Sequence, residues 1–482
     1  MYLTPTKLMN LQIDLTAIDA DSKALKELIQ EDFESKQHMR DGSDYYIGKH
    51  SEILSKNFAE FYSKPGVTDE DCDASNNKVI HVFHRKMVNQ KVEITLSKGV
   101  KISANDEKLE TQINKTVGTN FDVILIKYAK GASNHGLEWV TPYIDTKGKF
   151  KLKVISAEEI IPIYDDLDPD DLLQVMRYYY KSIKIDGEIQ NQLIVEVWNK
   201  NNYEIYAENK DGGLTQIETR PHFLFNTFLN GEIADSKHMS WGAVPFIRLL
   251  NNDEETTDLQ PIKSLIDDYD LHVSDASNSL ADVADAVWSL VNYHGQDLGE
   301  FRKNLKQLKA IPTDKDGGAT PHTLDLPTAA RDSQLNRDKD NIYSLGQGVD
   351  TSEVKFGDSP SGIALLLRFA DIIMKSNSML RYMESSLYEI MGFVNKYYEL
   401  SNKKGDNYIL FNPTDLRFTF ELALPINQKE VVEMLNMDSL LDIETKLSQH
   451  PLTLGQTAQD IIDKKAKEID VEPLPDEAPE EA

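Results

Sequence analysis

The sequence has almost no cysteine, no long hydrophobic run and far fewer basic than acidic side chains. Cys72 is the single cysteine, which excludes a disulfide framework or a cysteine-built zinc site and fits a reducing compartment. The longest apolar candidate, Ile363–Met374, contains Arg368 and Asp371 and is shorter than the ~18 residues of a membrane span. Met1–Asp14 lacks the apolar run of a signal peptide. We therefore expect neither a membrane protein nor a secreted one.

The motifs of common catalytic sites are missing as well. The sequence contains no GxxxxGK[ST] phosphate-binding loop and no GxSxG nucleophile elbow. Gly346 and Gly348 end a predicted helix and do not follow a strand, so they do not form a dinucleotide-binding fingerprint. The sequence thus predicts no catalytic residue, no metal site and no bound cofactor, and indicates a protein that is not an enzyme.

Two clusters come nearest to a metal site. His81 and His84 are close enough on a predicted helix to share one face, but we interpret them as polar residues on its solvated side. The acidic run Asp165–Asp171 would suit a metal-dependent phosphodiesterase. It lacks the glycine and closing glutamate of an EF-hand and contains Pro169, so a solvated acidic turn between strands is the simpler interpretation. The phosphodiesterase stays open as an alternative.

The net charge is −28, from 52 basic and 80 acidic residues. Proteins that grip nucleic acid usually have the opposite sign, because their affinity comes largely from neutralising phosphates. Either nucleic acid is not a partner, or DNA has to move past this surface without sticking to it. Net charge alone does not choose between these two interpretations.

The first half of the chain predicts a mixed α+β region, within a protein whose length suggests two to four domains. Residues 1–64 are predicted to be mainly helical, and a further helix is predicted over 76–90. Between 91 and 244 the apolar residues alternate, starting with Val92, Ile94 and Leu96, which is typical of strands. The sheet is therefore expected to be antiparallel.

Helices dominate the second half. Two predicted helices flank a short β-bearing insert, and the longest apolar stripe follows them. The predicted helices cover 258–284, 327–349, 361–398, 428–447 and 454–466. A strand is predicted at 416–422, and the acidic tail 468–482 is expected to be disordered.

Several short segments follow one another in an order typical of a single protein family. They are YYIGKH at 45–50, NNKVI at 76–80, ISAEEIIPIYDD at 155–166, WGAVPF at 241–246, the acidic leader and helix at 251–270, GQGVD at 346–350 and SPSGIAL at 359–365. Each segment is weak by itself, but their shared order is specific. Over most of its length the chain resembles the portal proteins of long-tailed phages that infect Gram-positive bacteria.

The resemblance implies an α+β portal fold and a ring of about twelve or thirteen identical subunits. The wing would combine helices with an antiparallel sheet, the stem would be helical with a small α/β clip, and the crown would be mostly helical. In chain order the implied parts are wing 1–250, stem helix 251–284, clip 285–326, stem helix 327–349, tunnel loop 350–360, long wing helix 361–407, crown 408–467 and disordered acidic tail 468–482.

By the same resemblance, the tunnel loop projects into the channel and touches DNA. Lys355 is its one cation and Phe356 its one aromatic residue, with Gly357 and Ser359 beside them. The acidic surroundings of Lys355 argue against strong gripping. An ordinary surface loop is the alternative.

The channel lining is expected to be acidic. Asp267, Asp268, Asp270 and Asp275 lie on the first stem helix, and ring symmetry would repeat each carboxylate around the bore. Phosphates would then meet like charge, so that DNA slides without binding tightly. Without the resemblance, these aspartates would be interpreted as the solvated face of a helix.

Arg302, Lys303, Lys306 and Lys309 form a basic cluster in the implied clip. They could contact the packaging motor or the head-completion adaptor, or approach phosphates at the channel exit. A solvated helix face is an equally good interpretation of the same residues.

The implied function is a non-enzymatic conduit at one capsid vertex, for genome packaging, head–tail joining and DNA ejection. Its implied partners are copies of itself, double-stranded DNA, the terminase large subunit, a head-completion or adaptor protein, and the major capsid and scaffold proteins. It would occur in the virion and, during assembly, in the host cytoplasm. An acidic capsid or scaffold-interaction protein without a DNA channel is the alternative.

Overall fold

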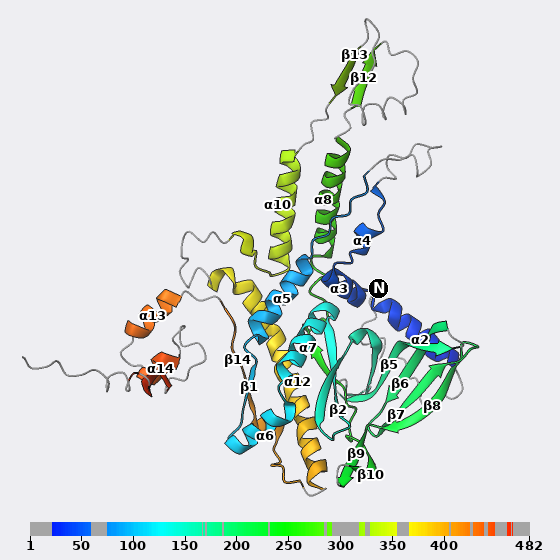
Figure 1. Cartoon of the computed structure of the whole chain (residues 1–482), viewed down its shortest axis with the longest axis vertical. Helices are drawn as coiled ribbons and strands as arrows, with labels where there is room; N and C mark the ends of the chain where they lie inside the picture. Colours follow the sequence, from blue (N-terminus) through cyan, green and yellow to red (C-terminus); the bar gives the residue numbers. More distant parts are fainter. Residues whose placement is uncertain are drawn as a thin grey trace, which may run out of the picture.

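The computed structural model shows a mixed α/β body from which a pair of helices projects, with a small hairpin at the far end of the pair (Figure 1). The structure describes residues 22–58, 75–165, 167–168, 171–185, 188–229, 232–283, 287–291, 318–322, 328–353, 366–403, 406–424, 428–437, 442–448, 460–463 and 465.

The described residues of the first predicted helical region, 22–58, are mainly helical, as predicted, and helices also occur further along the chain. The described helices up to His135 are α2 (Ser22–Ser35), α3 (Gln37–Ile47), α4 (Ser51–Leu54), α5 (Phe83–Leu96), α6 (Glu107–Val117) and α7 (Phe121–His135). The strand predicted at Val92–Leu96 is wrong, because these residues form the last turns of α5. Ile94 and its neighbours are buried on several sides of that helix, so the alternation of apolar residues does not report a strand here. The helix predicted over 76–90 begins only at Phe83.

Antiparallel sheets form the rest of the body, as expected. The central sheet has the order β11-β2-β3, and the larger sheet the order β4-β5-β6-β7-β8. The strands are β2 (Leu137–Ile144), β3 (Phe150–Ile155), β4 (Ile160–Tyr164), β5 (Leu172–Ile185), β6 (Glu188–Trp198), β7 (Asn202–Glu208), β8 (Leu214–Pro221), β9 (Phe223–Leu229), β10 (Glu232–Met239) and β11 (Ile247–Leu250). The 3-10 turn η4 (Ala157–Glu159) precedes β4. Leu25, Leu28 and Ile29 of α2 pack on the larger sheet.

The main core lies between α5, α6, α7, the central sheet and α12 (Ala370–Asn402), whose Met383, Leu387 and Ile390 are fully buried. The predicted division at residue 408 does not coincide with a structural boundary. The 3-10 turn η6 (Pro413–Asp415) leads into β14 (Arg417–Phe420), which pairs with β1 (Val100–Ser103) of the body. Leu416 is buried in the same core.

The projecting pair consists of α8 (Lys263–Val283) and α10 (Thr328–Leu345), which lie side by side (Figure 1). At its far end β12 (Val287–Val291) pairs with β13 (Gly318–His322) in an antiparallel hairpin. The helix α8 begins later than the predicted residue 258, because Asp258 lies in a turn where its amide donates to the carbonyl of Ser133. The short turn η5 (Thr351–Glu353) follows the pair.

Two short helices, α13 (Gln428–Met437) and α14 (Ile443–Ser448), follow β14 where a single helix was predicted over 428–447. None of the helices in the described part of the chain has the length and apolar character needed to span a bilayer.

Candidate functional site at the base of the helix pair

The helix pair meets the body at a small hydrophobic core, and the candidate site surrounds that core. Ile266 of α8, Ile262 just before α8 and Ile342 of α10 are fully buried there, against Tyr45 and Phe83 of the body. Burying each such side chain stabilises the folded protein by about 1.5–3 kcal/mol. This packing therefore holds the base of both helices against the body.

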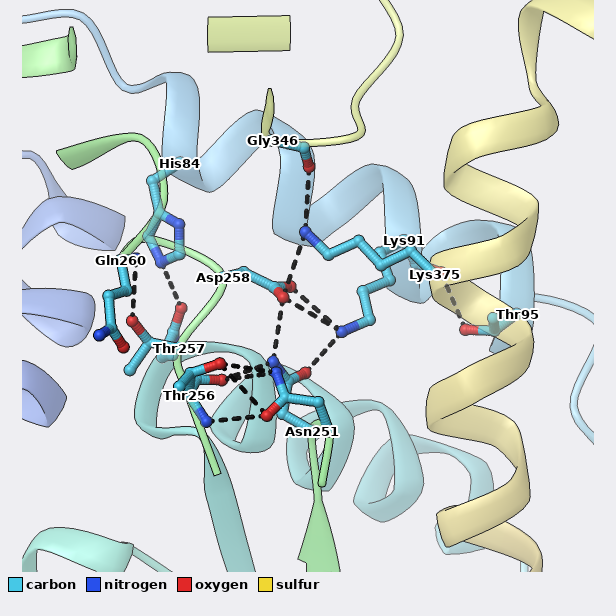
Figure 2. A network of polar contacts seen from close by, with 12 residues as sticks. His84, Lys91, Thr95, Asn251, Thr256, Thr257, Asp258, Gln260, Gly346 and Lys375 are labelled. Atoms are coloured by element: carbon cyan, nitrogen blue, oxygen red, sulfur yellow. Dashed lines mark hydrogen bonds and ion pairs between the residues drawn. The ribbon is translucent and has the colours of Figure 1, made fainter. Parts of the chain in front are cut away.

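Figure 2 shows a charge cluster centred on the buried Asp258. Asp258 directly precedes Leu259, which belongs to this core. Lys91 Nζ is 3.1 Å from Asp258 Oδ2, and Lys375 Nζ is 3.1 Å from Asp258 Oδ1. Asn251 Nδ2 donates to the same carboxylate at 3.0 Å. Lys375 also donates to the carbonyl of Gly346 at 3.0 Å. The cluster therefore joins α5, α12, the segment before α8 and the turn after α10.

The charges within the cluster follow from burial and pairing. Burial alone would raise the pKa of Asp258, but Lys375 and Lys91 hold that pKa far below its usual range. Burial lowers the pKa of Lys91 to about 8, against the opposing effect of Asp258. Burial also lowers the pKa of nearby His84 to about 4. At neutral pH Asp258 is therefore ionised and His84 is neutral.

Asp270 of α8 belongs to a second buried cluster. Its side chain is 0% exposed, with His50 Nδ1 2.6 Å from Oδ2 and His81 Nδ1 2.8 Å from Oδ1. The His81 amide donates to the same Oδ1 at 2.9 Å. The prediction that Asp270 lines a channel is wrong, because a carboxylate enclosed within its own chain does not present charge to a bore.

The other three aspartates predicted for the lining lie nearer the surface. Asp267 accepts a hydrogen bond from the Tyr45 hydroxyl and is 3.2 Å from Lys263 Nζ. The Asp268 side chain is 46% exposed, with His272 Nε2 3.5 Å from it, and Asp275 is half-buried. The structure thus leaves Asp268 and Asp275 as the most available carboxylates of the predicted set.

His81 and His84 do not form a pair. His81 faces Asp270, whereas His84 is 1% exposed and its Nε2 is 2.9 Å from Asn134 Oδ1. The expectation of a shared solvated face is therefore wrong, because the helix begins at Phe83, after His81, and its first turn is buried.

The chain leaving α10 is anchored at the start of the predicted tunnel loop. Asp350 pairs with Lys339 of α10, and Lys86 Nζ lies 3.7 Å from it. Burial alone would raise the pKa of Asp350, but hydrogen bonds from Lys339 and Ser352 hold it at about 2. Gln90 of α5 exchanges two hydrogen bonds with the Val349 backbone, at 2.7 and 3.1 Å.

The glycines of the GQGVD segment have a packing role. A Cβ on Gly346 would lie 2.5 Å from the sulfur of Met87, and one on Gly348 would lie 2.6 Å from Met87 Cγ. Larger residues would therefore push this turn away from α5.

Two groups of predicted site residues lie outside the described residues. They are the tunnel-loop residues Lys355, Phe356, Gly357 and Ser359, and the basic cluster Arg302, Lys303, Lys306 and Lys309.

A serine, a histidine and a glutamate meet in an order that resembles a hydrolase triad. Ser43 Oγ is 2.8 Å from His135 Nε2, and His135 Nδ1 is 2.9 Å from Glu138 Oε2. Burial alone would lower the pKa of His135, but hydrogen bonds to Glu138 and Glu158 and their charges raise it to about 9. A protonated imidazole cannot take a proton from serine, so this arrangement does not activate a nucleophile at neutral pH.

The acidic run Asp165–Asp171 forms the connection between β4 and β5. The Asp165 carboxylate accepts hydrogen bonds from the amides of Leu167 and Asp168, at 2.8 and 3.2 Å. The Asp165 amide donates to the carbonyl of Asp171 at 2.9 Å. Asp165 thus stabilises a turn, as the simpler interpretation of this run has it.

Sequence reasoning missed the Asp258 cluster. It treated 251–270 as an acidic leader and a solvated helix, although Asn251 and Asp258 are both buried. A usable signal was present in Lys91, which at helical spacing shares a face with Val88 and Val92. A lysine in such surroundings needs a buried acidic partner.

Comparisons with known proteins agree with one another. A family model described as "Phage portal protein, SPP1 Gp6-like" matches residues 25–471. The portal protein of Bacillus phage SPP1 is 28% identical over 445 residues, which cover 90% of this chain and 84% of that protein. The portal protein of Clostridium phage phiCD119 is 28% identical over 376 residues, covering 73% of this chain and 77% of that protein.

Among solved structures, a chain from the neck of a native GTA particle computed with C12 symmetry has a TM-score of 0.37 and 9% identity, over 77% of this chain and 91% of that chain. A chain from the neck of an empty GTA particle computed with C6 symmetry has a TM-score of 0.38 and 7% identity, over 75% and 86%. The family match extends from α2 to beyond α14, and it is this match that identifies the protein. The chain belongs to the SPP1 Gp6-like family of phage portal proteins.

Proposed function

We propose that copies of this chain close into a ring that forms the DNA channel at one vertex of the capsid. DNA would pass through it during packaging by a terminase motor and again during ejection, and the ring would join head to tail. The proposal rests on the family match over residues 25–471. It is also supported by the way α8 and α10 project from the body and present the β12–β13 hairpin at their far end (Figure 1).

In this proposal the body is the wing, α8 and α10 are the stem, and the β12–β13 hairpin belongs to the clip. The long helix α12 is part of the wing. Because β14 pairs with β1, we assign residues 408–424 to the wing and begin the crown at α13. The acidic residues 468–482 form a tail after the crown.

The acidic lining of the channel is proposed to come from Asp268 and Asp275 of α8, with Asp267 a weaker contributor because Tyr45 and Lys263 already engage it. In a ring each carboxylate is repeated by every subunit. Repulsion between these charges and the phosphates would keep DNA from binding tightly to the wall.

Lys355 and Phe356 are proposed to touch the DNA from the tunnel loop, one through a phosphate and one through its aromatic face. The loop would start from a fixed point, because Asp350 and Val349 are bonded to α5 and α10. The basic residues of the clip, from Arg302 to Lys309, would meet the terminase large subunit or the head-completion adaptor.

The ring is proposed to act as a passive conduit, with the energy for DNA movement coming from a separate ATPase. Within the described residues, the arrangement nearest to a catalytic triad is Ser43–His135–Glu138, whose histidine is protonated at neutral pH. Capsid and scaffold proteins would surround the wing during assembly in the host cytoplasm.

Native mass spectrometry of the purified protein tests the proposal. We expect a single closed oligomer of about twelve or thirteen subunits. A protein that stays monomeric at every concentration, and also in virions, would exclude the conduit and favour a capsid or scaffold-interaction role.

A further inference from the structure

Residues 76–82, here called the strap, run along α8 and are bonded to it by hydrogen bonds at alternate positions. The strap is neither helix nor strand and leads directly into α5. Asn77, Val79 and His81 each donate their backbone amide to a side chain of α8. The residues between them make no such bond to a described part of the helix.

The accepting side chains are Asp270, Ser274 and Asn278, which lie one helical turn apart on one face of α8. Four residues of helix rise by about 6 Å. Two residues of extended chain rise by about 6.6 Å. The two spacings agree closely enough for every second strap residue to face a side chain one turn further along α8. Each such pair is here called a rung, and the three together the ladder.

Two of the three rungs are reciprocal, as in a β-ladder. The Asn77 amide donates to Asn278 Oδ1 at 2.6 Å, and Asn278 Nδ2 donates to the Asn77 carbonyl at 3.1 Å. The Val79 amide donates to Ser274 Oγ at 3.0 Å, and Ser274 Oγ donates to the Val79 carbonyl at 3.4 Å. Asn278 and Ser274 therefore bond both the backbone amide and the backbone carbonyl of their strap residue.

The third rung is formed by the carboxylate of Asp270. The His81 amide donates to Asp270 Oδ1 at 2.9 Å, and the imidazoles of His81 and His50 both contact the same carboxylate. Ser274 and Asp270 are each 0% exposed. Breaking the ladder would thus leave buried polar groups without partners, which is unfavourable.

We infer that Asp270, Ser274 and Asn278 are positioning residues that fix the height and rotation of α8 on the body. A slide of α8 by one turn toward the hairpin would bring Ile266 opposite His81, whose amide would then lose its acceptor. The strap continues into α5, which carries Lys91 and Lys86. Lys91 pairs with Asp258 and Lys86 with Asp350, so the ladder connects α8 to the helix that holds both of these aspartates. The role of this lock in DNA passage rests on the proposed function.

Amide hydrogen exchange of the full-length protein, followed by mass spectrometry with single-residue fragmentation, tests the ladder. In the S274A/N278A variant we expect the amides of Asn77 and Val79 to exchange about tenfold faster than in the unaltered protein. The control S277A/N341A also replaces one serine and one asparagine by alanine, at Ser277 of α8 and Asn341 of α10. Neither residue belongs to the ladder, so both exchange rates should be unchanged. Asn278→Asp keeps the acceptor and loses the donor, so it should preserve protection of Asn77.

The ladder would be overturned if the exchange rates of the Asn77 and Val79 amides changed by less than about twofold in S274A/N278A. It would also be overturned if these amides were already unprotected in the unaltered protein. This measurement does not depend on whether the protein forms a channel. If the Asn77 amide in Asn278→Asp loses protection as fully as in S274A/N278A, the pairing argument is wrong as well.

The functional consequence is measured by packaging with rings of each variant. We expect S274A/N278A to form rings but to package DNA at least about fivefold less efficiently than S277A/N341A. Normal packaging despite lost protection would overturn the positioning role. Absence of rings in the unaltered protein would instead refute the proposed function and leave the ladder standing.

Discussion

The ammonium of Lys375 lies 3.1 Å from the carboxylate of Asp258, which ties the long helix α12 to the segment that leads into α8. The same ammonium donates to the Gly346 carbonyl at the end of α10. One side chain thus connects both helices of the projecting pair to α12. The start of α12 and the base of the pair cannot shift independently without breaking these contacts.

We predict that Lys375→Met destabilises the protein by about 3 kcal/mol, because the buried Asp258 loses one of its two lysine partners and the Gly346 carbonyl loses a donor. Unfolding in denaturant measures the change. Lys396→Met is the matched control: it removes a half-exposed pair with Glu399 and should cost less than about 1 kcal/mol. Equal effects of the two substitutions would contradict the role assigned to Lys375.

Asp270→Asn should destabilise the protein by about 3 kcal/mol, because the buried carboxylate holds two imidazoles and one amide. Asp268→Asn, on the exposed side of the same helix, should change the free energy of unfolding by less than about 1 kcal/mol. Thermal unfolding of both variants measures the difference. A neutral Asp270→Asn would show that the aspartate is not held as the structure has it.

The protonated state of His135 predicts a loss of stability with rising pH. Hydrogen bonds and charges from Glu138 and Glu158 overcome burial and raise its pKa to about 9, above the ordinary value of 6.5. The contribution is therefore complete below pH 6.5 and disappears as the pH rises through 9. Between pH 6.5 and 8 the free energy of unfolding should fall by about 1–2 kcal/mol.

His135→Gln should remove this slope, whereas His272→Gln, at a partly exposed site on α8, should keep it. Denaturant titrations at pH 6.5 and pH 8 are sufficient. A slope in the unaltered protein that His135→Gln leaves unchanged would assign the proton to another group.

Two helical glycines should respond in opposite ways to alanine. A Cβ on Gly42 of α3 would lie 1.9 Å from the backbone oxygen of Asn134, so Gly42→Ala should cost about 3 kcal/mol. Gly392 of α12 has no described atom within 4 Å of its Cβ position, so Gly392→Ala should stabilise the helix by about 0.5–1 kcal/mol. Differential scanning calorimetry distinguishes them; a stable Gly42→Ala would show that α3 and α7 are not in close contact.

The tunnel loop is tested by function. Phage carrying Lys355→Ala together with Phe356→Ala should assemble particles that contain less DNA, because the proposed contacts with the moving duplex are lost. Particle number and DNA content, measured from the same preparation, separate assembly from packaging. Normal DNA content would favour a purely structural role for the loop.

Local patterns predicted the helix pair and the long helix, although α8 and α12 begin several residues later than expected. An insert that contains strands lies between the two helices, as expected. The alternation between 91 and 244 predicted antiparallel strands, and the structure contains them, as in the pairing of Leu137–Ile144 with Phe150–Ile155. The same alternation failed at Val92–Leu96, because a helix buried on several sides carries apolar residues in nearly any pattern.

The candidate site was harder to predict, because the residues that pair within it are distant from one another in the sequence. Asp270 lies one helical turn after Ile266, on the apolar face of α8, and only tertiary structure brings His50 and His81 to it. Asp258 similarly depends on Lys91 and Lys375, which lie in other helices. Periodicity reports which face of a helix is apolar, but it does not report which polar residues that face encloses.

The most direct test is a cryo-electron microscopy map of the purified particle at side-chain resolution, viewed along its axis. We predict a closed ring whose channel at the level of α8 is lined by Asp268 and Asp275, with Asp270 enclosed in each subunit. A channel wall formed mainly by lysine and arginine, or particles that do not close, would contradict the account.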